Sequence, residues 1–123
     1  MNNAKNPSLQ DLTDAKFIVS FISLLPKDAP GYSNAANQMM TAVKHQQGFV
    51  GVYSARNEDG IGITVSYWSH LEAIAAWKVN RAHSAIQKRG KTEWYDWYQL
   101  QVGEIVRSSE GGRSLSAEQA KNI

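Results

Sequence analysis

Two tryptophans and two histidines fall within SYWSHLEAIAAWKVNRAH, residues 66–83. The histidine with the clearest chemical use is His83, because a neutral imidazole with an ordinary pKa of about 6.5 can take a proton from a phenol near neutral pH. On a helix its face would be shared by Ile86, Gln87, Gly90 and Trp94. The other interpretation is a histidine that bonds to the backbone and packs beneath its helix.

The tryptophans allow two interpretations as well. Trp68 and Trp77 offer large rigid faces that suit the walls of a flat aromatic pocket, or they fill the core. Trp94 and Tyr98 are expected to lie in a strand and to share one face with Asp96, where packing in the core or in a dimer interface is the alternative to ligand binding.

The remaining polar groups are weaker candidates. His70 is expected to be exposed, and His45, at the end of a helix, to be exposed or structural. A basic run either attracts an anionic substrate or forms a solvated face; its members are Lys78, Arg81, Lys88, Arg89 and Lys91. The sequence contains no cysteine, phosphate loop, dinucleotide fingerprint, H-x-x-x-H pair or nucleophile elbow, which excludes disulfide and thiolate chemistry and leaves no recognisable nucleotide site.

The length of the chain predicts a single small domain, and its charge bears on possible partners. The chain has 123 residues and a net charge of +2, too little to indicate nucleic acid as a partner. No apolar run approaches the roughly 20 residues of a membrane span, and residues 1–16 lack the apolar core of a secretory signal, so no membrane partner and a cytoplasmic location are expected. We expect a flexible lead at 1–15, one domain at 16–107 and a tail at 108–123, in which 116–121 is a candidate short helix.

Hydrophobic periodicity predicts the elements that position these residues. Residues 16–25 read as a central strand, since both of its faces are largely apolar. A helix capped by Ser33 is expected to run to about His45. Two runs on either side of Asn57-Glu58-Asp59-Gly60 predict a hairpin. Ser69 and Glu72 form a capping box for a helix whose apolar face is Leu71, Ile74 and Ala75, with Trp77 at its edge.

That helix is expected to break near Val79-Asn80 and to be followed by a second one over 81–91 and by a last strand over 94–107. The order β-α-β-β-α-α-β predicts an α+β fold of the ferredoxin-like, split β-α-β kind, with a four-stranded antiparallel sheet and its helices on one face. Because the first and last strands carry apolar residues on both faces, a second copy is expected to cover the bare face, giving a homodimer.

Residues 16–107, approximately, resemble the antibiotic-biosynthesis monooxygenase family of dimeric α+β barrel proteins. The resemblance is carried by GFVGVYSAR at 48–56 and by Tyr67-Trp68, Leu71-Glu72-Ala73, Trp77, His83, Gln87, Gly90, Trp94-Tyr95 and Tyr98. It implies either oxidation of aromatic phenols without a cofactor or the binding and degradation of heme. In the heme-degrading members the ligand histidine lies one helical turn further on, where this chain has Gln87.

The first hypothesis is therefore a monooxygenase that needs no cofactor and that oxidises a small electron-rich aromatic, a quinol, phenol or anthrone, with O₂. Its base is His83, and its substrate-binding residues are Trp68, Trp77, Gln87 and Trp94. The alternatives are a heme-binding or heme-degrading protein, in which heme is the cofactor and no other metal is bound, and a dimeric protein that binds a small molecule without catalysis.

Overall fold

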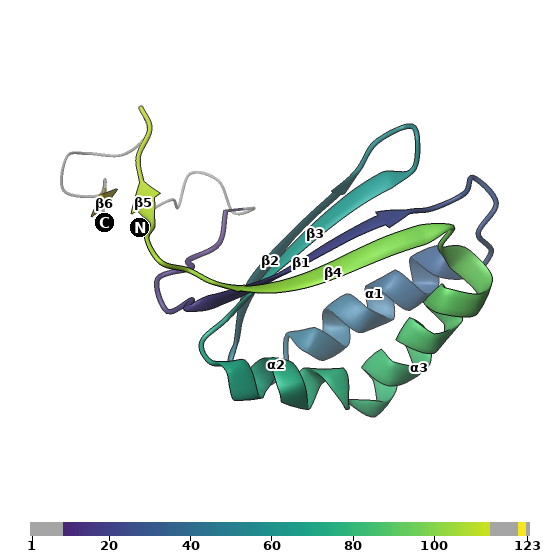
Figure 1. The fold of residues 1–123 in the computed structure, drawn as a ribbon, viewed down its shortest axis with the longest axis horizontal. Helices are drawn as coiled ribbons and strands as arrows, with labels where there is room; N and C mark the ends of the chain where they lie inside the picture. Colours follow the sequence, from purple (N-terminus) through teal and green to yellow (C-terminus); the bar gives the residue numbers. More distant parts are fainter. Residues whose placement is uncertain (1–8, 114–120, 123) are drawn as a thin grey trace.

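A computed structural model gives the structure of the chain and describes residues 9–113 and 121–122. Four strands form one antiparallel sheet in the order β2-β3-β1-β4 (Figure 1). Their bounds are Phe17–Leu24 for β1, Phe49–Arg56 for β2, Ile61–Trp68 for β3 and Trp97–Glu104 for β4. The predicted central position of the first strand is confirmed, since β1 pairs with β3 on one side and with β4 on the other.

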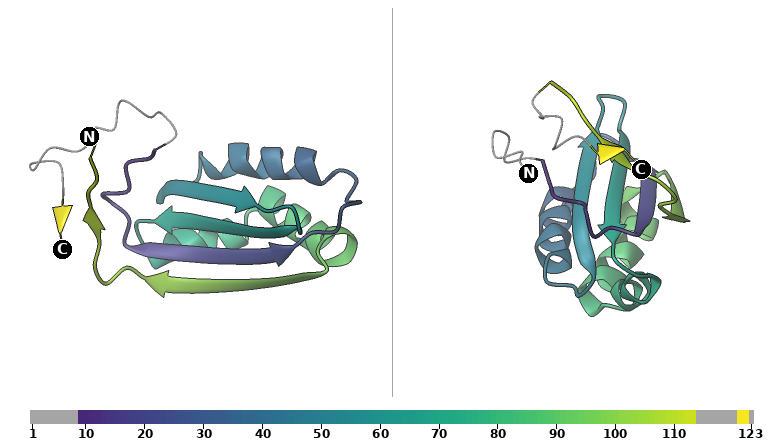
Figure 2. Two further views of the ribbon diagram at one scale, coloured as in Figure 1. Left: turned by 90° about the horizontal axis from the view of Figure 1, so that it is seen from above. Right: turned by 90° about the vertical axis from the view of Figure 1, so that its left-hand side faces the viewer.

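Three helices cover one face of this sheet, as Figures 1 and 2 show. They are α1 (Tyr32–Val43), α2 (Leu71–Lys78) and α3 (Arg81–Arg89), and α3 continues into a π-helical turn over Gly90–Trp94. The α+β, ferredoxin-like fold with its helices on one face is thereby confirmed.

The core lies between the helices and one side of the sheet. Along β1, Phe17 and Val19 pack with Val43 of α1 against Trp68 and Trp77. The predicted face of α2 was wrong in part. Ala73 and Trp77 are its buried residues, whereas Leu71 is 51% exposed, because the helix is rotated so that Trp77 points into the core.

The opposite side of the sheet carries large apolar side chains, and no helix of the described residues covers it (Figure 1). Ile22 of β1 is in register with Ile63 of β3, and Leu24 is in register with Ile61 of β3 and Trp97 of β4. Ile63 is 50% exposed, Trp97 51% and Ile61 46%. Large apolar side chains grouped in this way on a sheet are typical of an interaction surface.

Both predicted helix caps were wrong by one or two residues. Gly31 precedes α1 with a φ of 83°, so Ser33 lies inside the first turn. His70 caps α2, and its Nδ1 accepts a hydrogen bond from the Ala73 amide at 3.2 Å. Ser69 does not cap the helix, and its amide and hydroxyl both donate to the carbonyl of Gly48.

The last strand begins later than the sequence predicts, at Trp97 and not at Trp94. Trp94 belongs to the π-helical turn and is 3% exposed, so it shares no strand face with Asp96 and Tyr98. Gly90 begins this turn and accepts a hydrogen bond from the Tyr95 amide. A Cβ at residue 90 would lie 2.8 Å from the ring of Tyr95, so the turn depends on the glycine.

The described segments before β1 and after β4 lie beside one end of the sheet (Figure 2). The Gln10 side chain bonds to both the amide and the carbonyl of Val52, on the outer edge of β2. Past β4, β5 (Ser109–Glu110) pairs with β6 (Lys121–Asn122), and the candidate helix at 116–121 lies almost wholly outside the described residues. No helix among the described residues is long and apolar enough to cross a membrane.

Candidate functional site

The position of His83 is set by the short break between α2 and α3. The Asn80 side chain accepts a hydrogen bond from the His83 amide at 3.2 Å, the pattern of an asparagine that caps a helix start. His83 therefore lies in the first turn of α3. From there its ring folds back over the last turn of α2.

The ring of His83 stacks on that of Trp77. The two centroids are 4.5 Å apart and the planes differ by 7°. His83 Nδ1 lies 2.9 Å from the Trp77 carbonyl oxygen, which also accepts a hydrogen bond from the Asn80 amide at 3.0 Å. Because a carbonyl only accepts, Nδ1 carries the proton, and in the neutral ring Nε2 keeps its lone pair. The ring is thus held in the form that can accept a proton at Nε2.

Burial lowers the pKa of His83 below its ordinary value of 6.5, and the hydrogen bond to Trp77 offsets part of this effect. The imidazole is therefore neutral at physiological pH. This state suits a general base, because the lone pair is already free when a substrate arrives.

The lowered pKa predicts a pH-dependent contribution to stability. The unfolded chain takes up a proton at His83 near pH 6.5, before the folded chain does, so His83 stabilises the fold fully above that pH. We expect this contribution to be lost as pH falls from 6.5 through the lowered pKa of the folded state. The free energy of unfolding of the wild type and of His83→Gln would be measured with urea at pH 5 and 7.5. A gap between them that is no smaller at pH 5 would contradict the prediction.

Trp68 and Trp77 lie together, although the former is more a core residue than a pocket wall. Trp68 is 1% exposed, and its Nε1 donates to the Ser66 hydroxyl at 2.9 Å. Phe49 meets its ring edge-on. Trp77 is 8% exposed and carries His83 on one face. Of the two tryptophans, Trp77 is therefore the one that contacts the candidate base.

Of the other two predicted site residues, Gln87 lies on α3 and Trp94 lies in the π-helical turn that follows α3. Gln87 is half-buried one turn after His83. Trp94 is in the turn past the other end of α3, where its Nε1 donates to the Pro30 carbonyl and its ring lies under the Arg89 guanidinium at 4.6 Å. Glu93 pairs with the same guanidinium. Arg89 is thus engaged within the chain, and Trp94 is not beside His83.

Near Trp94, at the C-terminal end of α3, lies a hydrogen-bonded polar network that was not predicted from the sequence. The Arg56 guanidinium donates to the hydroxyls of Ser23 at 3.0 Å and of Tyr32 at 3.1 Å, and the Tyr95 hydroxyl donates to Tyr32 at 3.2 Å. One signal for it existed, because Ser23 is the polar exception on the helix-facing side of β1. Its partners come from β2, α1 and the segment before β4, which no local pattern connects.

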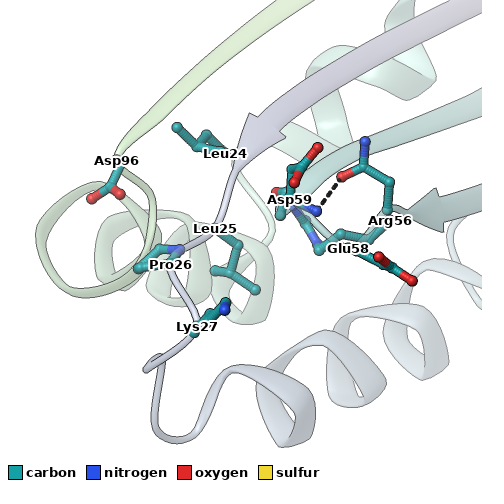
Figure 3. A pocket seen from close by; sticks show the side chains of 10 residues that line it. Leu24, Leu25, Pro26, Lys27, Arg56, Glu58, Asp59 and Asp96 are labelled. Atoms are coloured by element: carbon teal, nitrogen blue, oxygen red, sulfur yellow. Dashed lines mark hydrogen bonds between the residues drawn. The ribbon is translucent and has the colours of Figure 1, made fainter.

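A hollow of about 520 Å³ lies at the end of β1, between Leu24–Lys27 and the turn of the β2–β3 hairpin (Figure 3). Its charged lining residues are Lys27, Arg56, Glu58, Asp59 and Asp96. None of the five predicted site residues lines it. Trp68 is in register with Phe17 at the other end of β1, so this hollow and the Trp68–Trp77–His83 group lie at opposite ends of the sheet.

The fold is shared by several solved structures. SnoaB from Streptomyces nogalater, described as a cofactor-independent oxygenase, matches with a TM-score of 0.65 and 8% identity over 76% of this chain and 96% of its own. A structure described as an antibiotic biosynthesis monooxygenase matches with 0.65 and 6% identity over 73% and 98%. A Mycobacterium tuberculosis protein matches with 0.66 and 10% identity over 75% and 96%. The chain thus shares the ferredoxin-like α+β fold of these proteins.

Sequence comparison places it more narrowly. The chain is 37% identical over 91 residues to the uncharacterized protein YqjZ of Bacillus subtilis (strain 168), covering 74% of this chain and 80% of that protein. It belongs to the same family as YqjZ. No family model matches the sequence.

Proposed function

We propose that the protein is a monooxygenase that oxidises a small electron-rich aromatic, an anthrone, phenol or quinol, with O₂ and without a cofactor, and that His83 is its base. The observation that carries the proposal is the His83–Trp77 pair. The hydrogen bond from Nδ1 to the Trp77 carbonyl leaves Nε2 as a proton acceptor beside a flat indole. The description of SnoaB as a cofactor-independent oxygenase on the same fold supports the reaction class.

The steps balance without a further reactant. For an anthrone, Nε2 of His83 takes a proton from the ring CH₂, which leaves a resonance-stabilised carbanion. The carbanion passes one electron to O₂, and the two radicals combine into a C–O bond. The proton held by His83 returns to the outer peroxide oxygen. Loss of water from this hydroperoxide gives the ketone, so one O₂ becomes one carbonyl oxygen and one water.

The test is oxygen uptake by the purified full-length chain with anthrone and with 1,4-naphthoquinol, and with no cofactor added. We expect uptake above the rate of autoxidation, with one O₂ consumed per anthrone. Heat-denatured protein gives the background rate. Uptake no faster than this background would reject the oxygenase. A parallel hemin titration that gives a Soret shift with a stoichiometric end point, lost in His83→Ala, would replace the proposal with heme binding.

We also propose that the active form is a homodimer in which the uncovered sheet faces pack together. The exposed face of β1, β3 and β4 presents Ile61, Ile63 and Trp97 around half-buried Ile22 and Leu24. Aliphatic and aromatic side chains of this kind form the centre of stable interfaces.

Ile63→Glu is expected to convert the protein from a dimer into a monomer, because it places a charge at the centre of that apolar face. Light scattering after gel filtration should give about twice the 13.7 kDa chain mass for the wild type and one chain mass for the variant. Leu71→Glu is the matched control, since Leu71 is equally exposed but lies on α2. A monomeric wild type, or a dimeric Ile63→Glu, would count against this interface.

A further inference from the structure

The strongest unassigned feature is the network of Ser23, Tyr32, Arg56 and Tyr95, at the end of α3 away from His83. Tyr32 is its centre. The Tyr32 oxygen accepts hydrogen bonds from the Arg56 guanidinium and from the Tyr95 hydroxyl. Its own hydroxyl hydrogen has no acceptor among residues 9–113 and 121–122. A hydroxyl that accepts two hydrogen bonds, one of them from a cation, donates a stronger one itself.

The groups around Tyr32 keep this arrangement fixed. Arg56 also donates to the carbonyls of Gly60 and Ser23, and in the described part of the chain it makes no ion pair. It fits there because Gly62, its partner in register on β3, has no side chain: a Cβ at residue 62 would lie 2.4 Å from the guanidinium carbon. Burial, and then the hydrogen bond to Tyr32, raises the pKa of Tyr95 well above its usual range, so Tyr95 stays protonated and keeps donating.

Aromatic rings surround this donor. The Tyr32 ring meets Trp94 edge-on at 5.5 Å and Tyr95 at 5.7 Å, and Phe21 lies 5.4 Å from Tyr95 and 5.7 Å from Tyr98. On the neighbouring strand Leu100, in register with Phe21, is 44% exposed. The helix-facing side of the sheet is thus apolar and only partly covered here, beside one oriented hydroxyl donor.

We propose that Tyr32 is a ligand-binding residue that donates a hydrogen bond to a carbonyl or phenol oxygen of a flat aromatic ligand lying against Phe21, Tyr98 and Leu100. Arg56 and Tyr95 are positioning residues that hold the Tyr32 hydroxyl. Aromatic edges favour a planar apolar ring, and an oriented hydroxyl favours a ring that carries an acceptor oxygen. The choice of an oxygenated aromatic as the ligand rests on the proposed oxygenase function.

The test compares two probes that share their rings and differ in oxygen, 1,4-naphthoquinone and naphthalene, by NMR titration of the full-length chain. A quinone is already oxidised, so neither turnover nor His83 enters the measurement. We expect the wild type to prefer the quinone, and Tyr32→Phe to weaken quinone binding about threefold to tenfold, the usual effect of one hydrogen bond, while naphthalene binding is unchanged. Tyr95→Phe should weaken quinone binding less.

Tyr67→Phe is the matched control, because it removes a hydroxyl from the other face of the sheet, and it should change neither affinity. Equal weakening of both probes by Tyr32→Phe would show a packing role for Tyr32 and overturn the proposal. So would a wild type that does not prefer the quinone. Since oxygen uptake is not measured, the Tyr32 site can fail while the oxygenase proposal stands, and the reverse also holds.

Discussion

His83→Gln is expected to lower kcat/KM for anthrone oxidation by about 10²- to 10⁴-fold, the usual contribution of a positioned general base. Glutamine keeps a polar side chain of similar length but has no lone pair that takes up a proton near neutral pH. The loss should fall mainly on kcat, because the proton moves in the transition state and not on binding.

The measurement is initial oxygen uptake against anthrone concentration, for variants whose circular dichroism matches the wild type and that stay folded at the assay temperature. His45→Gln is the control, since His45 is exposed at the end of α1, and it should keep wild-type kinetics. In the wild type, kcat/KM should be flat around neutral pH and should fall only below the lowered pKa of His83. A folded His83→Gln with undiminished uptake would remove His83 from the mechanism.

Trp68→Ala is expected to lower the free energy of unfolding by about 3–5 kcal/mol, the range for removing a large aromatic side chain from a core. Trp68 is almost fully buried among Val43, Ala73 and Trp77, and its neighbours, which are held by two strands and two helices, can close the space it leaves only in part. The loss of its hydrogen bond to Ser66 adds to the effect.

Trp97→Ala provides the comparison, because it removes the same side chain from an exposed position on β4, where a loss below about 1 kcal/mol is expected. Both variants would be measured by urea unfolding in the Ile63→Glu background, so that any link between assembly and stability is common to them. Similar losses for Trp68 and Trp97 would show that the core is not centred on Trp68.

The strands and helices were predictable because their signals are local. The apolar run over 16–25, the two runs around Asn57–Gly60 and the break near Val79-Asn80 suffice to place β1, β2, β3 and the start of α3. The capping box failed for a tertiary reason: the Ser69 amide, which was expected to donate to Glu72, donates to the carbonyl of Gly48, 21 residues earlier in the chain, and His70 takes over the cap.

The candidate site was predictable only where two helices meet in sequence. Trp77 and His83 lie on either side of one short break, so their contact follows from the local chain. Trp94 was misplaced because helical spacing was carried from His83 to residue 94, whereas the π-helical turn has more residues per turn and redirects the side chain. Tyr32, Arg56 and Tyr95 meet only through the packing of distant elements, so sequence patterns could not group them.

The central position of β1 has a consequence for the order of folding. The first strand to leave the ribosome has its partners far along the chain: Phe17 pairs with Trp68 on β3 and with Glu104 on β4. The β2–β3 hairpin can form early from local contacts, but the middle of the sheet must wait for it, and the edge is completed only when β4 has been made. Until then the apolar side chains of β1 lack their final neighbours. The nascent chain therefore exposes an apolar, aggregation-prone segment until β3 and β4 have been made.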